Sequence, residues 1–237
     1  YLLDLRPFVE SDLQRETIDD WDKAQYRSFF TSEGVQFALP KYHGALALFY
    51  NKDIFDRFKL DYPTGEWTHG DYLLAMERIK SAAAAAGQKD LWPSMFDVSW
   101  ERIQVHVNSW NGHFVDPDNV SRSWMARQEA LTAMEWLRTR MWDDRVMASR
   151  LGVGNRNTRD AFIHHNLAMV EEGSWALRDI LEQADFRIGV APFPAGPGRR
   201  VTLATTDGFA VFSGTRQPEA AWELVKFLVG RDYGRAM

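Results

Sequence analysis

Residues 39–55 read LPKYHGALALFYNKDIF, and the centre of this stretch has the composition of a β-strand. Its apolar run, Ala45–Tyr50, has a length typical of a buried strand. Comparable apolar runs occur at Val35–Leu39, Arg187–Ala191 and Phe209–Phe212. Because segments with helical spacing separate these runs, the pattern predicts an α/β architecture with mostly parallel sheets.

Three segments have the spacing of amphipathic helices. The first begins at Thr68, which is placed to cap the helix with Asp71 at the capping-box position, and Gly87 ends it. The second covers about 127–142, and the third covers about 218–229 with a proline in its first turn.

The overall composition limits the class of protein. The chain has 237 residues, which fits one large domain or two modest lobes. Its net charge of −5, with acids and bases interspersed, argues against nucleic acid and anionic membranes as partners. The absence of cysteine excludes disulfides, thiolate metal sites and cysteine nucleophiles. No apolar run reaches the roughly 18 residues that span a bilayer. We expect both ends to be trimmed or disordered, so that the lack of a signal peptide leaves the compartment open.

Aromatic residues are the anomaly of the composition, with ten Trp, seven Tyr and fifteen Phe. An indole buries a large apolar area and also presents a flat face and one N–H donor. The high Trp content therefore fits either a Trp-rich core or a site that stacks rings against flat ligand faces. For any single Trp, the core is the favoured assignment.

The order of motifs along the chain resembles that of the family 1 extracellular solute-binding proteins, the maltose-binding-protein-like receptors. Residues 39–55 are similar to the family segment that ends in Tyr-Asn-Lys-Asp-Leu-Phe. Further segments resemble family motifs in the family's order: Pro63–Trp67, Trp110–Gly112, Ala161–Met169, Gly173–Trp175, Ile188–Pro194, Asp207–Val211 and Pro218–Leu228. Each motif is weak alone, but eight in this order cover nearly the whole chain. The departures at Asn166, where the family usually has Gly-Lys, and at His113, where it has Gly, affect local loops and not the fold.

The resemblance implies two α/β lobes of a periplasmic-binding-protein-like fold, joined by crossover strands, with the ligand held in the cleft between them. Residues 1–43 and 197–237 are expected to form the first lobe, which is incomplete in this chain, and residues 44–196 the second. Tyr42–Gly44 and the Pro- and Gly-rich segment Pro192–Gly198 are the expected crossovers.

The implied function is that of the substrate-binding component of an ABC importer. Such a protein is a non-enzymatic monomer without a cofactor, and it is periplasmic or extracellular and lipid-anchored. It binds a carbohydrate or polyol, closes around it by a hinge motion and delivers it to the membrane permease.

A sugar site needs aromatic rings for apolar C–H faces and planar polar groups for the hydroxyl rims. The resemblance places a stacking aromatic at Trp175 and further ligand contacts near the first crossover. The predicted ligand-binding residues are Trp175, Ser174, Trp110, Asn111, Tyr42, His43, Asp207, Gly208 and Trp100.

The polar candidates have structural alternatives. Capping of the helix that follows is the favoured role of Ser174. Asn111 lies beside a glycine and fits a helix C-cap. Asp207 and Gly208 form a pair that fits a turn.

The tryptophans also have structural alternatives. Trp175 fits a helix-start residue packed on the sheet, and at least one of Trp100 and Trp110 is expected to be core. Trp67 is expected to pack structurally, and Trp222 is assigned to the core.

Other site chemistries are weaker. His164 and His165 are adjacent and point about 100° apart on a helix, so they do not chelate one ion. His106 and His113 have no carboxylate or Cys to complete a ligand set, and no metal site is predicted.

A glycoside hydrolase is the alternative function, because it would share an aromatic sugar site but needs two carboxylates that flank the bond. The pairs Glu171-Glu172 and Asp143-Asp144 are expected to be solvated. A scaffold without a small ligand is a third class. The pair Arg199-Arg200 lies near a crossover, so a phosphorylated ligand is kept as an alternative to a neutral one.

Overall fold

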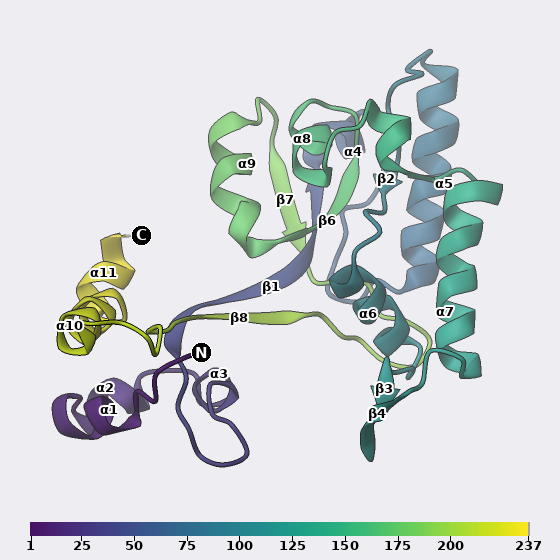
Figure 1. Ribbon diagram of the computed structural model, residues 1–237. Coiled ribbons are helices and arrows are strands. Elements are labelled where there is room, and N and C mark those ends of the chain that lie inside the picture. The colour runs from purple at the N-terminus through teal and green to yellow at the C-terminus, as the bar shows by residue number, and fades with distance from the viewer. Residues whose placement is uncertain (237) are drawn as a thin grey trace. The chain divides into compact units, whose positions relative to one another are not determined.

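The computed structural model describes residues 1–236, which fold into two compact units (Figure 1). The first unit consists of Tyr1–Gly44 and the chain from Ala204 onward, and the second consists of Ala45–Leu203. The polypeptide therefore passes between the units twice, first inside strand β1 (Leu39–Asn51) and again after Leu203. No described helix is both long enough and apolar enough to cross a bilayer.

The first unit is mainly helical, and one strand in it pairs with β1. Its core gathers around Leu5, Leu39 and Trp222. Trp222 is 2% exposed and its indole N–H donates to the Asp12 carboxylate at 2.7 Å, which confirms its assignment to the core. The elements of this unit are α1 (Arg6–Asp12), α2 (Arg15–Asp19), α3 (Lys23–Ser28), β8 (Ala204–Phe209), α10 (Pro218–Leu228) and α11 (Arg231–Ala236).

The second unit is built around the continuation of β1. This part of β1 lies between β6 (Met169–Gly173) and β7 (Ile188–Ala191) and runs antiparallel to both. β6 and β7 therefore run parallel to each other, with α9 (Leu177–Gln183) between them in sequence and β1 between them in the sheet.

The prediction of mostly parallel sheets is thus wrong. Strand–helix alternation does occur at β6, α9 and β7, but it does not reveal that a strand from much earlier in the chain separates the two parallel strands. The parallel pair that does form is short and joins β2 (Ser94–Met95) to β5 (Met147–Ala148).

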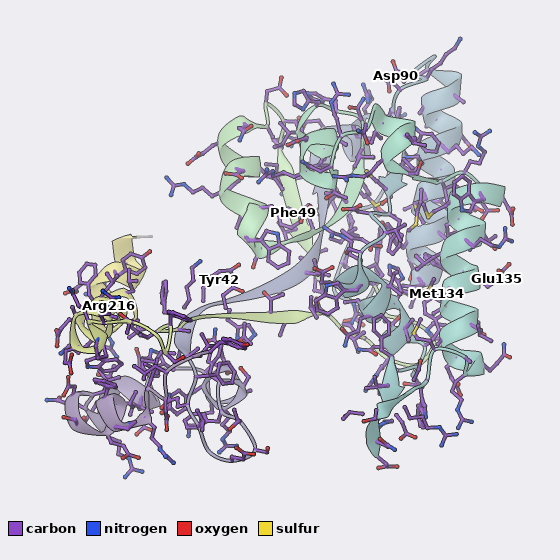
Figure 2. All side chains as sticks on the ribbon, in the orientation of Figure 1. Tyr42, Phe49, Asp90, Met134, Glu135 and Arg216 are labelled. Atoms are coloured by element: carbon purple, nitrogen blue, oxygen red, sulfur yellow. The ribbon has the colours of Figure 1, made fainter. Side chains whose placement is uncertain are left out.

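Helices cover both faces of this sheet, as Figures 1 and 2 show. Leu48 and Tyr50 pack in one cluster with α5 (His69–Ala85). Phe49 points to the other face and packs with α8 (Thr158–Ile163) and with Ile180 of α9. Burial on both faces explains why Ala45–Tyr50 is a continuous apolar run rather than an alternating one.

The remaining elements of the second unit are short or peripheral. They are α4 (Lys52–Arg57), α6 (Trp100–Ser109), β3 (Val115–Asp116), β4 (Asn119–Ser123), α7 (Gln128–Arg138), a π-helical turn (Thr139–Asp143), and 3₁₀ turns at Arg150–Val153 and Ser174–Ala176.

The helix predictions are confirmed. Thr68 and Asp71 form a reciprocal capping box at the start of α5, and Gly87 follows its end with a φ of +70°. α7 and α10 lie within the two other predicted segments.

Two of the predicted strands are wrong. Val35–Leu39 forms only an isolated bridge between Phe30 and Gln36 before β1 begins. The last strand, β8, ends at Phe209 instead of beginning there. β8 is polar and largely exposed, so it carries no apolar pattern, and it is held by backbone pairing with β1.

The capping box gives a direct test of the start of α5. Replacing Thr68 with Ala removes the hydroxyl that accepts the Asp71 N–H, so we expect the free energy of unfolding to fall by about 1 kcal/mol. Urea denaturation measures the change, with Thr68→Ser as the control that keeps the hydroxyl. Equal losses in both variants would show that the cap does not stabilise this helix.

Candidate functional site

The indole of Trp175 is fixed by the glycine two residues before it. Trp175 stands on the 3₁₀ turn that directly follows β6, and its ring folds back over Gly173. A Cβ atom at Gly173 would lie 2.0 Å from the ring, which is closer than real Cβ atoms approach, so no larger residue fits without moving the indole. The side chain is still 43% exposed.

The exposed side of Trp175 borders a hollow of about 320 Å³, which we call the Trp175 hollow. Its volume is at the lower end of the range of small-molecule sites, about 300–1,000 Å³. The lining is mostly polar and comes from α6, α8, β6 and adjoining turns: Glu101, Arg102, Asn157, Thr158, Arg159, Glu172, Trp175 and Ala176.

Glu172 forms the centre of a buried polar network under this hollow. It is 5% exposed, and one carboxylate oxygen accepts from the Arg102 guanidinium at 3.1 Å and from the Gly173 N–H at 2.9 Å. The other oxygen accepts from the Thr158 hydroxyl. Both oxygens are therefore satisfied without a ligand.

Glu171 is buried as well, with 1% exposure. Its carboxylate oxygens lie 3.0 and 3.2 Å from Nε2 of His106, which is itself fully buried. The expectation that Glu171-Glu172 is a solvated doublet is wrong, because Arg102 and His106 lie one turn apart on α6 and each supplies a partner for one carboxylate.

Glu101 lines the Trp175 hollow but is absent from the residues predicted from the sequence. One of its carboxylate oxygens is buried and has no hydrogen-bond partner among the described residues, a rare condition for a buried polar atom. The available signal was its place beside the predicted Trp100, which begins α6 and is 62% exposed.

The favoured role of Ser174 as a helix cap is wrong. Its hydroxyl makes no capping hydrogen bond and instead accepts the N–H of Ala45 at 3.2 Å. Because Ala45 belongs to β1, Ser174 ties the start of the 3₁₀ turn to the central strand. A strand partner this distant in sequence gives no local signal.

Asn111 ends α6 as the residue directly after the C-cap Trp110, which agrees with the capping role considered for it. It adopts a left-handed conformation with φ of +62°. Its N–H donates to the carbonyl of Asn108, and the N–H of Gly112 donates to that of Val107, which is the Schellman pattern. The Asn111 side chain also packs against Gly198, where a Cβ atom would lie 2.5 Å from it.

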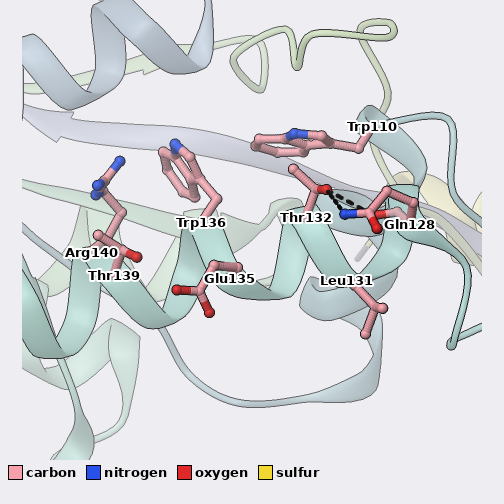
Figure 3. Close-up of a pocket in the computed structure, with 8 residues that line it drawn as sticks. All are labelled: Trp110, Gln128, Leu131, Thr132, Glu135, Trp136, Thr139 and Arg140. Carbon is pink, nitrogen blue, oxygen red and sulfur yellow. Dashed lines mark hydrogen bonds between the residues drawn. The ribbon is translucent and has the colours of Figure 1, made fainter.

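Trp110 borders a different hollow, of about 540 Å³, which we call the Trp110 hollow (Figure 3). It shares no lining residue with the Trp175 hollow. Of the three predicted tryptophans, Trp110 and Trp175 therefore do not line the same pocket of the second unit. The lining consists of Trp110, Gln128, Leu131, Thr132, Glu135, Trp136, Thr139 and Arg140.

A buried histidine supports the two indoles of the Trp110 hollow. The ring centroid of His69 lies 4.6 Å from that of Trp110 and 4.9 Å from that of Trp136, and the His106 ring lies 5.2 Å away. His69 is 4% exposed and neither ring nitrogen has a partner among the described residues. Burial, and secondly the neighbouring His106, lower the pKa of His69 from 6.5 to about 2, so its ring is neutral.

Four predicted residues belong to the first unit. Tyr42 (Figure 2) and His43 are exposed on β1. Asp207 and Gly208 are exposed within β8 rather than in a turn. Partial burial, followed by a hydrogen bond to Asp207, raises the pKa of the Tyr42 hydroxyl. Gly208 packs against Phe29, whose ring would lie 2.6 Å from a Cβ atom there.

Arg199 and Arg200, for which a phosphorylated ligand was considered, donate hydrogen bonds to backbone carbonyl groups. Arg199 donates to the carbonyl of Asn108 at 3.1 Å, and Arg200 donates to the carbonyls of Phe193 and Trp67. Neither lines the Trp175 hollow. Within the described residues, no three His, Asp or Glu side chains are grouped to hold a metal ion.

Sequence comparison places the chain among bacterial binding proteins. Residues 1–235 match the family described as bacterial extracellular solute-binding protein. A binding protein of Brucella abortus is 24% identical over 212 residues, which are 85% of this chain and 48% of that protein. The chain thus spans about half the length of the curated relatives it matches.

Solved structures share the fold at low sequence identity. The ABC substrate-binding protein of Listeria monocytogenes in complex with cycloalternan superposes with a TM-score of 0.88 at 22% identity, over 98% of this chain and 57% of that one. The solute-binding protein of Agrobacterium radiobacter in complex with ribitol superposes with a TM-score of 0.79 at 19% identity, over 100% of this chain and 59% of that one. The maltose-bound MalE3 of T. maritima superposes with a TM-score of 0.77 at 20% identity, over 98% of this chain and 59% of that one. The chain has the two-lobed fold of periplasmic sugar-binding proteins.

The contact between Gly173 and Trp175 predicts a coupled pair of substitutions. Gly173→Ala forces the indole out of its position, and we expect it to lower the free energy of unfolding by about 1–3 kcal/mol. In the Trp175→Ala background the same change meets no ring and costs much less. Urea denaturation of the four proteins gives the coupling energy, and additive losses would show that the ring does not lie on Gly173.

The low pKa of His69 predicts a pH-dependent stability. Below about pH 6.5 His69 binds a proton in the unfolded chain, whereas in the folded protein it stays neutral down to about pH 2. The free energy of unfolding therefore falls as the pH is lowered. From pH 7 to pH 5 this amounts to about 2 kcal/mol. His69→Phe removes the titrating ring. Urea denaturation at pH 7 and pH 5 should therefore show that the variant loses about 2 kcal/mol less stability between these pH values than the unsubstituted protein. Equal losses in the two proteins would contradict the neutral, buried state of His69.

Proposed function

The chain belongs to the bacterial extracellular solute-binding protein family, and we propose that it acts as the substrate-binding component of an ABC importer for a neutral carbohydrate or polyol. The observation that carries this proposal is the half-exposed indole of Trp175, held beside a row of polar side chains. Sugars present apolar C–H faces and hydroxyl rims, and this pairing of a flat ring with hydrogen-bonding groups matches both.

The Trp175 hollow supplies both kinds of hydrogen-bonding group. The Glu101 side chain is partly exposed and lines the hollow, and a carboxylate accepts hydrogen bonds from hydroxyl donors. Arg159 and Asn157 lie at the same hollow and offer N–H donors, although Arg159 is also paired with Asp179 and Asn157 caps α8. A solute hydroxyl can both donate and accept a hydrogen bond, so it can bind to the Glu101 carboxylate as a donor and to Arg159 or Asn157 as an acceptor.

The ligands of the structural relatives support the choice of solute class. Four of the relatives were solved with cycloalternan, maltose, ribitol and, in a protein of Agrobacterium vitis, D-mannitol, which are neutral polyhydroxyl compounds. Another, UgpB of Mycobacterium tuberculosis, was solved with glycerophosphocholine, which is a phosphodiester. The engagement of Arg199 and Arg200 with backbone carbonyls also favours a neutral solute over a phosphorylated one.

Binding without chemical change is favoured over glycoside hydrolysis. A glycosidase needs two carboxyl groups that are free to act on the sugar bond. Of the two glutamates that line the Trp175 hollow, Glu172 is held by Arg102 and Thr158, so Glu101 has no second free carboxyl group beside it there. Glu171 does not line the hollow and is paired with the buried His106. These carboxylates serve structural pairing instead.

The setting follows from the family, which is an extracellular one. We propose that the mature protein works outside the cytoplasmic membrane, in the periplasm or on a lipid anchor, as a monomer that passes its solute to the permease subunits of the importer. Tyr42, His43, Asp207, Gly208 and Trp100 stay predicted solute contacts.

Substitution of Trp175 tests the proposed site. Titration calorimetry of the full chain against maltose, ribitol and D-mannitol should give saturable heat with at least one solute, which is recovered unchanged. Trp175→Ala should weaken that binding by about 1–3 kcal/mol. Trp142→Ala is the matched control, because Trp142 is 63% exposed and lines neither hollow.

Two results would contradict the proposal. An unchanged dissociation constant in Trp175→Ala would remove this residue from the site. Release of a hydrolysis product would replace the receptor function by an enzymatic one.

A further inference from the structure

The Trp110 hollow has a wall of two indoles. The ring centroids of Trp110 and Trp136 are 5.7 Å apart, with 50° between the ring planes. Figure 3 shows Trp110 over the side chains of Gln128 and Thr132, with Trp136 further along α7. Both tryptophans are only partly buried, so each contributes surface to the hollow.

The indoles are held in place from behind. His69 packs against both rings, and His106 stacks on Trp136 at a centroid distance of 5.7 Å with 24° between planes. His106 is in turn fixed by Glu171 of β6. The wall is therefore preorganised and loses little conformational freedom when a ligand binds.

The charges around the hollow are already compensated. Glu135 makes two hydrogen bonds to the guanidinium of Arg138, at 2.8 and 2.9 Å. Arg140 pairs with Asp144 and lies 5.3 Å from the centroid of the Trp136 ring. No lining charge is left to select an ion, so the hollow fits a neutral ligand.

The remaining lining groups are neutral hydrogen-bonding groups. Gln128 and Thr132 are exposed and bonded to each other, with the Gln128 amide 3.2 Å from the Thr132 hydroxyl. The amide offers both a donor and an acceptor, and Thr139 adds another hydroxyl. Flat apolar faces beside such groups are the features that recognise a sugar ring.

We propose that the Trp110 hollow is a second carbohydrate-binding site, which takes one neutral pyranose ring, either free or as part of a longer saccharide. The volume of about 540 Å³ accommodates a ligand of this size. The site is independent of the proposed solute site, because the two hollows have no lining residue in common. They lie at opposite ends of α6, whose length is about 15 Å.

The experiment follows the indole N–H resonances of the full chain by two-dimensional ¹H–¹⁵N NMR. Trp110→Phe and Trp136→Phe identify the two signals. The probes are methyl β-D-glucopyranoside and maltose, and benzyl alcohol is a flat ring without the hydroxyl rim. We expect saturable shifts of both signals with the sugars, at concentrations up to tens of millimolar.

Two arginine substitutions on exposed positions of α7 provide the blocking variant and its control. Thr132→Arg fills the hollow without removing a buried side chain, and it should weaken the sugar-dependent shifts at least tenfold. Glu129→Arg places the same side chain on an exposed position that does not line the hollow and should leave the shifts unchanged. Trp175→Ala should also leave them unchanged, which separates this site from the proposed solute site.

Three outcomes would overturn the proposal. The first is the absence of saturable shifts with both sugars, or shifts with benzyl alcohol alone. The second is persistence of the shifts in Thr132→Arg. The third is their loss in Trp175→Ala, which would mean that the sugar binds at one site only.

Discussion

Enclosure of the second half of β1 is the constraint on which the second unit depends. β6 and β7 satisfy its backbone groups at both edges, and separate apolar clusters cover its two faces. If β1 shifted by one residue against its neighbours, Phe49 would move to the face that Leu48 and Tyr50 now occupy, and these two would move to the face of Phe49. The two clusters therefore permit only the observed register. The end of β6 is fixed in the same way, and the Gly173–Trp175 turn that follows it takes a defined position.

The second determinant is the pair of buried carboxylates on β6. Consecutive strand residues point to opposite sides, yet Glu171 and Glu172 both find a partner on α6, at His106 and Arg102. Removal of one partner would leave a buried charge without compensation, which is strongly destabilising. These two pairs fix α6 against the sheet, and α6 carries a hollow at each end. The two hollows therefore share one structural support but have different linings.

Local signals predicted the local features of this fold. The capping box at Thr68 and the left-handed Asn111 that ends α6 depend on neighbours in sequence, and both are present. The core position of Trp222 was predicted from the local spacing of apolar residues in its helix, although its partners are distant in sequence. The antiparallel insertion of β1, the bond from Ala45 to Ser174 and the burial of Glu171 depend on partners that are distant in sequence, and these were missed. At the site, the motif around Trp175 drew attention to the ring. Glu101 was overlooked because an unpaired oxygen becomes visible only when its surroundings are known.

The ring of Trp175 lies on the backbone of Gly173, and this contact bears on the thermodynamics of binding. An exposed side chain that samples several rotamers loses that freedom when a ligand covers it, at a cost of about 0.5–1.5 kcal/mol. An indole already confined by its own chain has little of this entropy left to lose. More of the energy of stacking then remains as affinity, without any additional contact to the solute.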